Sequence, residues 1–552
     1  MMCNRFPTTP LMLVLLCGVA CAAPDTPKLL VDAGRAAQVH LAACDWTQEN
    51  GYVEGTGKSN NLVAGCRLEE GDFRITARLR MLNQEASAAS FFLGANHFGF
   101  EGAKRTFYLS GPIFGGLQLL GSPTDVFPRG EWIDFAVVRA GPDLRFSVNG
   151  KLIHTERYDG AGFDRFGFSP MRSTMQVSSF TVAGNTLELS EPLPPAYTIP
   201  TLDLARQKHR QTIVDREKGQ YLGHPTTVLL EDNKTILCVY PKGHGRGAIV
   251  YKRSTDGGLT WSDRLPTPES WATSLEVPTI HRVVDAEGKK RLITWSGLYP
   301  ARLAVSEDDG LSWSELKNVS DWGGIVVMGF VEKLATPGHY LAMFHDDGRF
   351  FGKDSKRMNP VEFRLYKTFS KDGGLTWSFP EVIQKDTAVH LCEPGVVRSP
   401  DGKQMAVLLR ENSRRRNSHV IFSDDEGKTW TEPRELPASL TGDRHTGVYA
   451  PDGRLFISFR DTTRQTPTKG DWVAWIGNYE DIVNGKEGQY RLRLMDNHKG
   501  GDCAYPGVLI LPDGTIVTTT YGHWTPDESP YVVTVRLRLE ELDQLHRRGL
   551  PN

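Results

Sequence analysis

Four acidic, phenolic or imidazole side chains recur at one place in a repeated pattern: His224, Glu393, His445 and Tyr505. The pattern is a strand-forming run, a turn and a second such run, and it covers residues 223–241, 276–297, 328–346, 393–411, 445–461 and 505–522. Val277 and Met328 take the same place in the other two units. Carboxyl, phenol and imidazole groups transfer protons. If the six units converge, the pattern predicts acid–base chemistry.

A second ring of side chains stands where the second run of each unit ends: Tyr240, Ser296, His345, Arg410, Arg460 and Tyr521. Arginine pairs with a planar carboxylate through two parallel hydrogen bonds and stays charged. Two arginines beside acids and phenols are more polarity than a packed core tolerates. The two rings together indicate a functional surface at the centre of the six units.

Six hairpins in succession are typical of a closed ring of blades, because closure removes the exposed edges that an open sheet would leave. A second repeat supports this interpretation. The motif Ser-x-Asp-x-Gly-x-(Thr/Ser)-Trp begins at Ser254, Ser306, Ser370 and Ser423. Its Ser and Asp can bond the turn's own backbone, its Gly permits a left-handed conformation, and its Trp can pack beneath the hairpin. We therefore predict a six-bladed β-propeller over residues 205–545.

The first half of the chain is organised differently. Residues 27–190 alternate between apolar and polar side chains, as in 134–157, where Asn149-Gly150 separates two apolar runs and indicates a hairpin. Segment 132–153 resembles the back-sheet strands of concanavalin-like jelly rolls, which often bind sugars beside a catalytic domain. We expect such a domain, as a carbohydrate binder or as a spacer. The proline-rich residues 191–204 predict a semi-rigid linker. The expected fold class is therefore all-β.

The N-terminus indicates export. Residues 1–23 have one arginine, an apolar run from Leu11 to Ala20 and small residues after it, the anatomy of a signal peptide. Cys17 and Cys21 leave a lipoprotein as an alternative, and the final compartment, whether periplasm, cell surface or medium, stays open. The formal net charge of -2 gives no field for nucleic acid, and no later apolar run predicts a membrane span. No motif implies a metal or an organic cofactor, and oligomeric state is not predicted.

The four Ser-Asp-Gly-Trp motifs (Asp-boxes), the six units, and above all EPGVVRSPDGKQMAVLLR from Glu393 with AYPGVLILPDG from Ala504, resemble the sialidases. The resemblance covers residues 205–540. It implies a six-bladed propeller that removes terminal sialic acid from glycans. In that family a tyrosine nucleophile is paired with a glutamate, three arginines clamp the substrate carboxylate, and an aspartate is the acid/base.

Residue by residue, the resemblance implies that Tyr505 is the nucleophile, Glu393 its activator, and Arg410 and Arg460 two members of the clamp. A neutral phenol suits this role, since the carboxylate on the anomeric carbon of sialic acid would repel an anionic nucleophile. The alternative interpretation is structural: a hydrogen-bonded Tyr505–Glu393 pair, with Arg410 and Arg460 in ion pairs with the adjacent Glu411 or Asp461.

Two of the family's residues are missing at their usual places. The first arginine is replaced by Gly223-His224, and the loop 241–247, PKGHGRG, contains no acid. Arg246 could supply the third cation. Four residues are candidates for the acid: His224, His244, Asp346 and Glu276. We expect His345 and His445 to line the channel, and SRRRN at 413–417 to be a solvated loop.

The preferred hypothesis is an exported exo-sialidase acting on a sialylated glycan or glycoprotein. Two alternatives remain. The protein could be a glycosidase or lyase for another acidic sugar, such as a uronic acid or a different nonulosonic acid, or it could bind glycans without catalysis.

Overall fold

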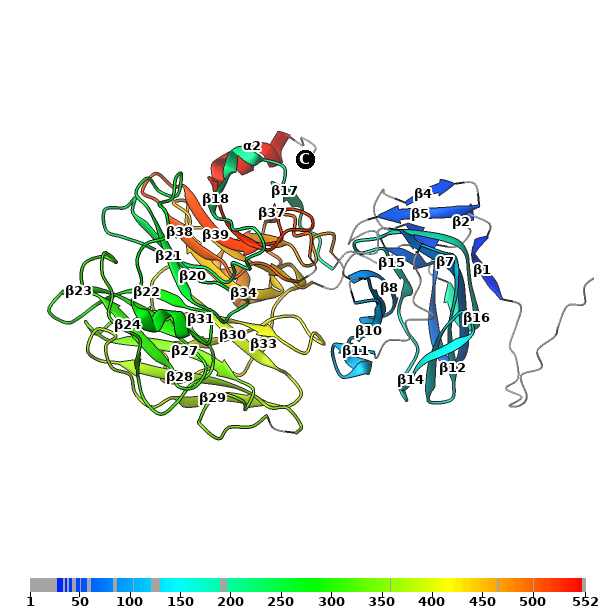
Figure 1. Cartoon of the computed structure of the whole chain (residues 1–552), viewed down its shortest axis with the longest axis horizontal. Coiled ribbons are helices and arrows are strands. Elements are labelled where there is room, and N and C mark those ends of the chain that lie inside the picture. The colour runs from blue at the N-terminus through cyan, green and yellow to red at the C-terminus, as the bar shows by residue number, and fades with distance from the viewer. Residues whose placement is uncertain are drawn as a thin grey trace, which may run out of the picture.

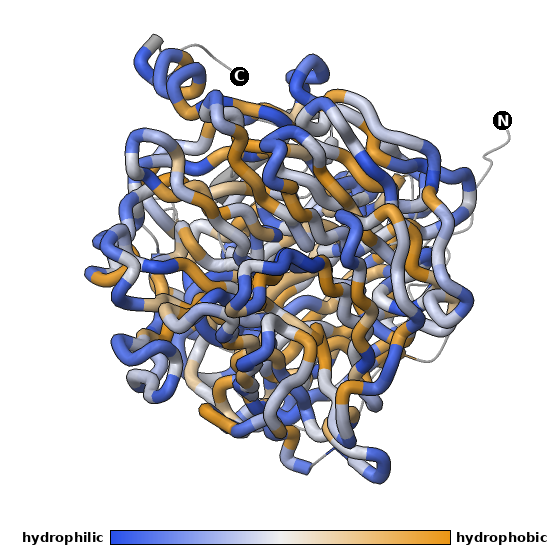
Figure 2. Tube along the Cα trace, turned by 90° about the vertical axis from the view of Figure 1, so that its left-hand side faces the viewer, coloured by the Kyte–Doolittle hydropathy of each residue, from blue (hydrophilic) through white to orange (hydrophobic). Residues whose placement is uncertain are grey.

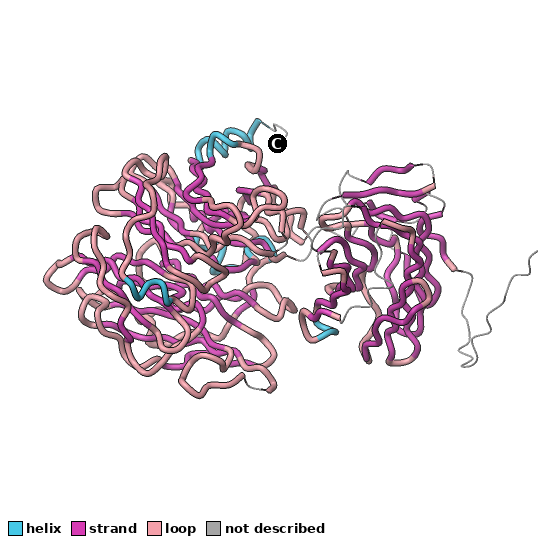
Figure 3. Tube along the Cα trace, in the orientation of Figure 1, coloured by secondary structure: helices cyan, strands magenta, loops and turns pink. Residues whose placement is uncertain are grey.

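The computed structural model describes residues 27–548, except 33–34, 37–38, 42–45, 50, 57–60, 83–86, 103, 121–129, 189–195, 358, 464–465 and 500. Two β-rich bodies lie side by side (Figure 1), and strands dominate both of them (Figure 3). The expected leader, residues 1–23, and the first part of the expected linker lie outside the described residues. The all-β prediction is confirmed.

The N-terminal body is a sandwich of two antiparallel sheets. One sheet has the order β14-β13-β12-β7-β16-β1-β2, with β5 beside β16 and β4 beside β5. Its strands are β1 (Lys28–Asp32), β2 (Arg35–Ala36), β4 (Trp46–Glu49), β5 (Tyr52–Thr56), β7 (Cys66–Leu82), β12 (Ile133–Ala140), β13 (Asp143–Val148), β14 (Lys151–Arg157) and β16 (Thr174–Glu188). The other has the order β11-β10-β9-β8-β15-β6-β3, from β3 (Val39–Leu41), β6 (Leu62–Ala64), β8 (Ser87–Leu93), β9 (Asn96–Glu101), β10 (Thr106–Ser110), β11 (Gln118–Leu119) and β15 (Phe166–Ser169).

Alternation along the strands explains this sandwich. In β12 every second residue from Ile133 is buried, and the residues between them are more exposed. The inward side chains form one core in which Phe98 stacks on Phe146 at 5.1 Å between ring centroids. The expected hairpin at Asn149-Gly150 joins β13 to β14, and both turn residues have positive φ, 50° and 76°. Such a two-residue turn matches the twist of the flanking strands.

The C-terminal body contains six sheets of three to five strands. In chain order their strands are β19 (Thr226–Leu229), β20 (Ile236–Pro241) and β21 (Ile249–Ser254); β22 (Thr279–Val284), β23 (Lys290–Ser296), β24 (Arg302–Ser306) and β25 (Lys317–Asn318); β26 (Ile325–Lys333), β27 (Tyr340–Asp346), β28 (Phe363–Ser370) and β29 (Glu381–Asp386); β30 (Leu391–Arg398), β31 (Met405–Glu411), β32 (His419–Ser423) and β33 (Arg434–Glu435); β34 (Gly442–Tyr449), β35 (Leu455–Asp461), β36 (Trp472–Gly477) and β37 (Tyr490–Met495); and β38 (Gly507–Ile510), β39 (Ile516–Gly522) and β40 (Tyr531–Leu537). Each expected hairpin forms the first two strands of one sheet. The six-bladed propeller is confirmed.

The ring closes through its first strands. Inner strands β19, β22, β26, β30, β34 and β38 contact one another in succession, and β38 contacts β19. β17 (Thr201–Asp203) adds a parallel strand to β37, and β18 (Gln211–Asp215) pairs with β40 as the outer strand of the sixth blade. Seen from the propeller side (Figure 2), hydrophobic stretches run through the body and hydrophilic loops gather at the rim. Two strands from the start of the propeller sequence, β17 and β18, therefore pair with strands of the fifth and sixth blades.

The four Ser-Asp-Gly-Trp turns, called the repeat turns below, follow the third strands of blades one to four. In the first, the Ser254 hydroxyl donates to Asp256 at 2.8 Å and accepts from the Gly258 N–H at 2.8 Å. Asp256 also accepts from the N–H and the hydroxyl of Thr260. The same bonds recur around Asp308, Asp372 and Asp425. The four tryptophans lie against the hydrophobic cores between blades.

Helices are few: α1 (Tyr479–Asn484), α2 (Leu539–Arg548) and short 3-10 turns at Pro112–Phe114, Lys208–Arg210, Glu269–Thr273 and Ala438–Leu440. Within the described part of the chain, no helix combines the length and the apolar character that a membrane crossing would need.

Candidate active site

The inner strands begin at one face of the ring, and their entries share an unusual backbone. Five of the six blades place a non-glycine residue with φ between 50° and 58° at this point: His224, Val326, Glu393, Arg444 and Ala504. A left-handed conformation is uncommon for residues that have a Cβ, and it is maintained where the surrounding structure enforces it, often at functional sites. The shared conformation places the side chains of different blades at the same level of the ring.

Tyr505 and Glu393 meet at this level. The Tyr505 hydroxyl donates to Oε1 of Glu393 at 2.5 Å, although the two residues lie in different blades. The exposed fractions are 8% for Tyr505 and 4% for Glu393. The second carboxylate oxygen of Glu393, Oε2, is buried and has no hydrogen-bond partner among the described residues. A buried unpaired acceptor indicates a place that a water or a ligand group fills.

Burial raises the pKa of Tyr505 well above its usual value, and Glu393 raises it further. Tyr505 is therefore a neutral phenol near pH 7. Burial would also raise the pKa of Glu393, but Arg410 and the Tyr505 hydroxyl outweigh this and hold it below its usual value. An ionised carboxylate thus accepts the hydrogen bond of a neutral phenol, the arrangement needed to deprotonate the phenol as it attacks.

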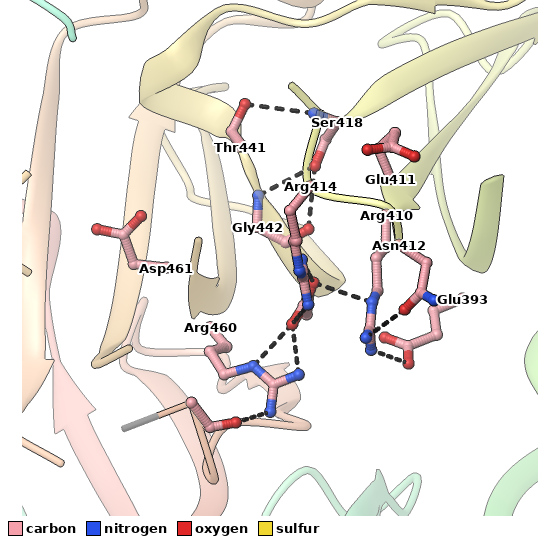
Figure 4. A network of polar contacts seen from close by, with 12 residues as sticks. Glu393, Arg410, Glu411, Asn412, Arg414, Ser418, Thr441, Gly442, Arg460 and Asp461 are labelled. Atoms are coloured by element: carbon pink, nitrogen blue, oxygen red, sulfur yellow. Dashed lines mark hydrogen bonds and ion pairs between the residues drawn. The ribbon is translucent and has the colours of Figure 1, made fainter. Parts of the chain in front are cut away.

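Three arginines, Arg410, Arg414 and Arg460, lie close together on one side of Glu393 (Figure 4). Arg410 donates to Oε1 of Glu393 at 2.5 Å and to Asn412 at 2.5 Å. Arg414 binds Asp443 through two hydrogen bonds of 2.5 and 2.8 Å, and Nε of Arg460 donates to the same carboxylate at 2.7 Å. Nε of Arg410 lies 3.2 Å from it. One buried carboxylate, Asp443, therefore already occupies the space between the three cations.

The charges of this cluster fix the protonation of Asp443. Burial opposes its ionised form, but Arg410, Arg414 and Arg460 together hold the pKa of Asp443 well below its usual value. Asp443 is fully buried and is ionised near neutral pH. Glu411 and Asp461, the alternative partners considered for the two arginines, bind elsewhere: Glu411 accepts the N–H groups of His390 and Ser413, and Asp461 pairs with Arg491 at 2.9 Å.

A second polar group flanks Tyr505 on the side of blade one. The ring of His224 lies 4.5 Å from that of Tyr505 and 4.7 Å from that of His244, between centroids. Nε2 of His224 is 3.1 Å from the Tyr521 hydroxyl, whereas its buried Nδ1 has no partner among the described residues. Burial lowers the pKa of His224 well below its usual value, and His244 lowers it further. His224 is therefore neutral.

Asp502 anchors this second group. Its carboxylate accepts hydrogen bonds from the Tyr221 hydroxyl at 2.5 Å and the Tyr521 hydroxyl at 3.3 Å, and lies 2.9 Å from Nε2 of His523. Nδ1 of His244 lies 2.6 Å from the Tyr221 hydroxyl and 3.5 Å from Asp502. Burial would raise the pKa of Asp502, but bonds with His244, His523 and Tyr221 hold it well below its usual range. Asp502 is three residues before Tyr505, so its partners also fix the loop of the phenol.

Glu276 lies on the approach to blade two. Its Oε1 accepts the Val277 N–H at 2.9 Å. Burial raises the pKa of Glu276, and nearby Glu393 adds to the increase, while Arg246 and His244 oppose it. Arg246 and His244 are exposed on the loop after β20. Of the four acid candidates, Glu276 combines a raised pKa with closeness to Glu393.

The remaining predicted residues have supporting positions. Asp346 accepts the N–H groups of Gly348 and Phe350 in its own turn; burial raises its pKa to about 6, and the groups that act on it lie in that same turn. Nδ1 of His345 accepts the Glu393 N–H at 3.3 Å, and burial lowers the pKa of His345 to about 4. The ring of His445 packs on Phe459 at 4.9 Å, and its Nε2 lies 3.1 Å from the Leu440 carbonyl oxygen.

Four further residues of the site were not predicted from the sequence: Asp443, Arg414, Arg444 and Asp502. Arg414 belongs to the segment expected as a solvated loop; its neighbours Arg415 and Arg416 are exposed, but Arg414 turns to the buried Asp443. Arg444 stands one residue before the His445 that was assigned to the ring. Of the described residues, no group of three or more His, Cys, Asp or Glu side chains is arranged to hold a metal ion.

Comparison with known proteins gives one family match and several similar solved structures. A family described as a BNR repeat-like domain matches residues 283–518. None of the curated proteins matches the chain in sequence. Similar solved structures include a protein of unknown function from Dyadobacter fermentans, 16% identical with a TM-score of 0.47, over 60% of this chain and 98% of that chain. An intramolecular trans-sialidase from leech is 14% identical, with a TM-score of 0.41 over 85% and 94% of the two chains. The NanB sialidase from Streptococcus pneumoniae is 12% identical, with a TM-score of 0.42 over 85% and 95%.

At these identities and scores the solved structures say nothing of this chain's reaction. The BNR match spans five of the six sheets of the propeller, from β22 to β39. The matched residues 283–518 lie within residues 205–540, the part of the chain that resembles the sialidases in sequence.

Proposed function

We propose that the protein is an exo-α-sialidase that releases terminal sialic acid from glycoconjugates, with Tyr505 as the nucleophile. The observation that carries this proposal is the 2.5 Å hydrogen bond from the Tyr505 hydroxyl to Glu393. A neutral phenol next to an ionised carboxylate suits an anomeric carbon that bears its own carboxylate, where an anionic nucleophile would be repelled.

In the first step Tyr505 Oη attacks the anomeric carbon, and its proton passes to Glu393. The glycosidic C–O bond breaks, and the leaving oxygen takes a proton from Glu276, whose pKa is raised by burial, as suits a general acid. In the second step water attacks the same carbon and gives its proton to Glu276, while the phenolate recovers its proton from Glu393. Two displacements retain the configuration of the sugar.

The test is release of free sialic acid from α2,3- and α2,6-linked sialyl-oligosaccharides by the wild type and by Tyr505→Phe and Glu393→Gln. Tyr449→Phe is a matched control, because it removes a hydroxyl that donates to the Arg398 carbonyl oxygen at 2.5 Å, outside the site. Release by the wild type and the control, with large losses in the other two, supports the proposal. No release from either linkage contradicts it, and the β-anomer formed first contradicts the retaining mechanism.

A second candidate function has its own observation. Asp443 already neutralises the arginines that would clamp a substrate carboxylate, and Gly223-His224 stands where the sialidases that the sequence resembles have their first arginine. Both departures favour a different acidic sugar, such as a uronic acid, cleaved by hydrolysis or elimination. Incubation with uronate-containing oligosaccharides distinguishes the two routes, since elimination produces an unsaturated product with new ultraviolet absorbance and hydrolysis does not.

A further inference from the structure

Arg444 owes its position to an irregularity in β34. Asp443 pairs with Arg460 and Thr446 with Ser458, so that Arg444 and His445 have no partner in the neighbouring strand. Extra residues of this kind bend a strand and redirect its side chains. Here Asp443 reaches Arg414, His445 packs on Phe459, and Arg444 reaches the Pro394 carbonyl oxygen beside Glu393.

The environment of Arg444 differs from that of the three arginines around Asp443. Its exposed fraction is 6%, and its Nη1 donates a long hydrogen bond of 3.4 Å to the Pro394 carbonyl oxygen. Among the described residues, no carboxylate lies within ion-pair distance of its guanidinium. Burying a cation without a partner is costly. The cost is recovered when an anion enters.

The net charge of the whole cluster also favours binding of an anion. Arg410, Arg414, Arg444 and Arg460 bring four positive charges to one place, while Glu393 and Asp443 bring two negative charges. Asp443 is bound to three of these arginines and Glu393 to one. The surplus positive charge therefore resides on the arginine that has no carboxylate of its own.

Arg444 also lies close to the reacting groups. Burial lowers its pKa, and Glu393 and Tyr505 partly offset this because both are near enough to act on it. The guanidinium stays charged, since its ordinary pKa is far above neutral. Its backbone has φ 58°, close to the 50° of Glu393 at the equivalent place in blade four. A ligand group bound by Arg444 would thus sit at the level of the phenol.

We infer that Arg444 binds the carboxylate of a sugar acid and sets the specificity of the site, in place of the cation expected from blade one. This inference rests on the proposed function for the position of the sugar but names a different residue for the anion. A guanidinium group can donate two parallel hydrogen bonds to the two oxygens of a carboxylate. Arg246, the earlier candidate for the third cation, is exposed on its loop and is the rival.

Calorimetric titration with N-acetylneuraminic acid and with its methyl ester tests the inference, because the ester keeps the sugar and loses the charge. D-glucuronic acid and its methyl ester form a second pair. The proteins are the wild type, Arg444→Met, Arg444→Lys, Arg246→Met and Arg434→Met. The last is a matched control, because Arg434 also binds carbonyl oxygens, those of Ile482 and Val483.

We expect the wild type to prefer one acid to its ester, and Arg444→Met to lose about 100-fold or more of the affinity for the acid with little change for the ester. Arg444→Lys should keep part of the preference, and the other two variants should keep all of it. A preference that survives Arg444→Met, or that disappears with Arg246→Met, overturns the inference. Absence of a preference for either acid overturns it too.

The two proposals can fail separately. Sialic acid released at an unchanged KM by Arg444→Met leaves the proposed function standing and rejects the role of Arg444. Acid binding that depends on Arg444, in a protein that turns over no sialoside, supports the role and rejects the proposed function.

Discussion

The two ends of the propeller strands are built on opposite plans. At the repeat turns, four blades keep the same residues, the same hydrogen bonds and a glycine with φ of 79–84°. At the entries to the inner strands, five blades keep the backbone, with φ between 50° and 58°, but carry five different side chains. Repetition of side chains marks the end that holds the fold. Repetition of backbone with varied side chains marks the end at which chemistry is assembled.

The largest expected effect, on kcat, comes from a change at the entries to the inner strands, where the site lies. Tyr505→Phe should reduce kcat on the substrate that the protein turns over by about 10³-fold or more, since it removes the nucleophile and keeps the ring. Thermal unfolding should change little. Steady-state kinetics beside a melting curve separate the two effects. A variant that retains wild-type kcat would mean that the phenol is structural.

Asp443→Asn tests whether the site end also carries stability. The change keeps the shape but leaves Arg410, Arg414 and Arg460 without the buried charge that they share, so we expect a loss of about 3–5 kcal/mol in the free energy of unfolding. Denaturant titration measures it. Asp256→Asn, the same change in a repeat turn, is the control and should cost less. Equal losses at the two ends would break the comparison.

Glu276→Gln sharpens the assignment of the acid. Burial raises the pKa of Glu276, and a general acid must be protonated, so activity should fall as the pH rises through this raised pKa. The variant should lose about 10²-fold in kcat. It should also lose the alkaline limb of the pH profile. If that limb persists in Glu276→Gln, another group supplies the proton.

The smallest effect belongs to a single repeat turn. Asp256→Ala removes the acceptor for the Leu259 and Thr260 N–H groups and should cost about 1–2 kcal/mol in the free energy of unfolding, with kcat unchanged. Unfolding by urea and an activity assay on the same preparation check this. Loss of activity without loss of stability would give the repeat turns a role in the site.

A related measurement concerns acid. In the fourth repeat turn, burial opposes ionisation, but bonds from Thr429 and Ser423 lower the pKa of Asp425 from 3.8 to about 2. A depressed carboxyl stabilises the folded state above its unfolded pKa, so this contribution is complete above about pH 4 and is lost as the pH falls through about 2. Asp425→Asn should therefore be less stable near neutrality and show a weaker dependence on pH in this window.

Features could be predicted from the sequence when the interacting residues are close together along the chain. The six hairpins and the repeat turns depend on neighbours a few residues apart, so their patterns are visible in the sequence. The Tyr505–Glu393 pair was available through resemblance. Arg444 was missed because the irregularity in β34 adds one residue, so that counting positions from the aligned units leads to its neighbour His445.

Asp443 was missed for a different reason. Arg410 and Arg460 were expected to bind the carboxylate of a ligand. The spacing of these residues in the sequence does not show that Asp443, a carboxylate of the protein itself, pairs with them. Asp502 was missed for the same kind of reason. Closure of the ring brings it together with its partners, which are Tyr221, His244, Tyr521 and His523.

The pairing of β18 with β40 also determines when the propeller ring can close during synthesis. Gln211 pairs with Val535, so a strand made early must remain unpaired while five blades and most of the sixth are synthesised. At roughly 5–20 residues per second this wait lasts on the order of tens of seconds. During that time Asp215 lacks the strand that covers it, and the nascent ring has two open edges. A ribosome-stalled chain that ends before residue 531 should therefore be cut by protease between blades one and six, at a place that the released protein protects.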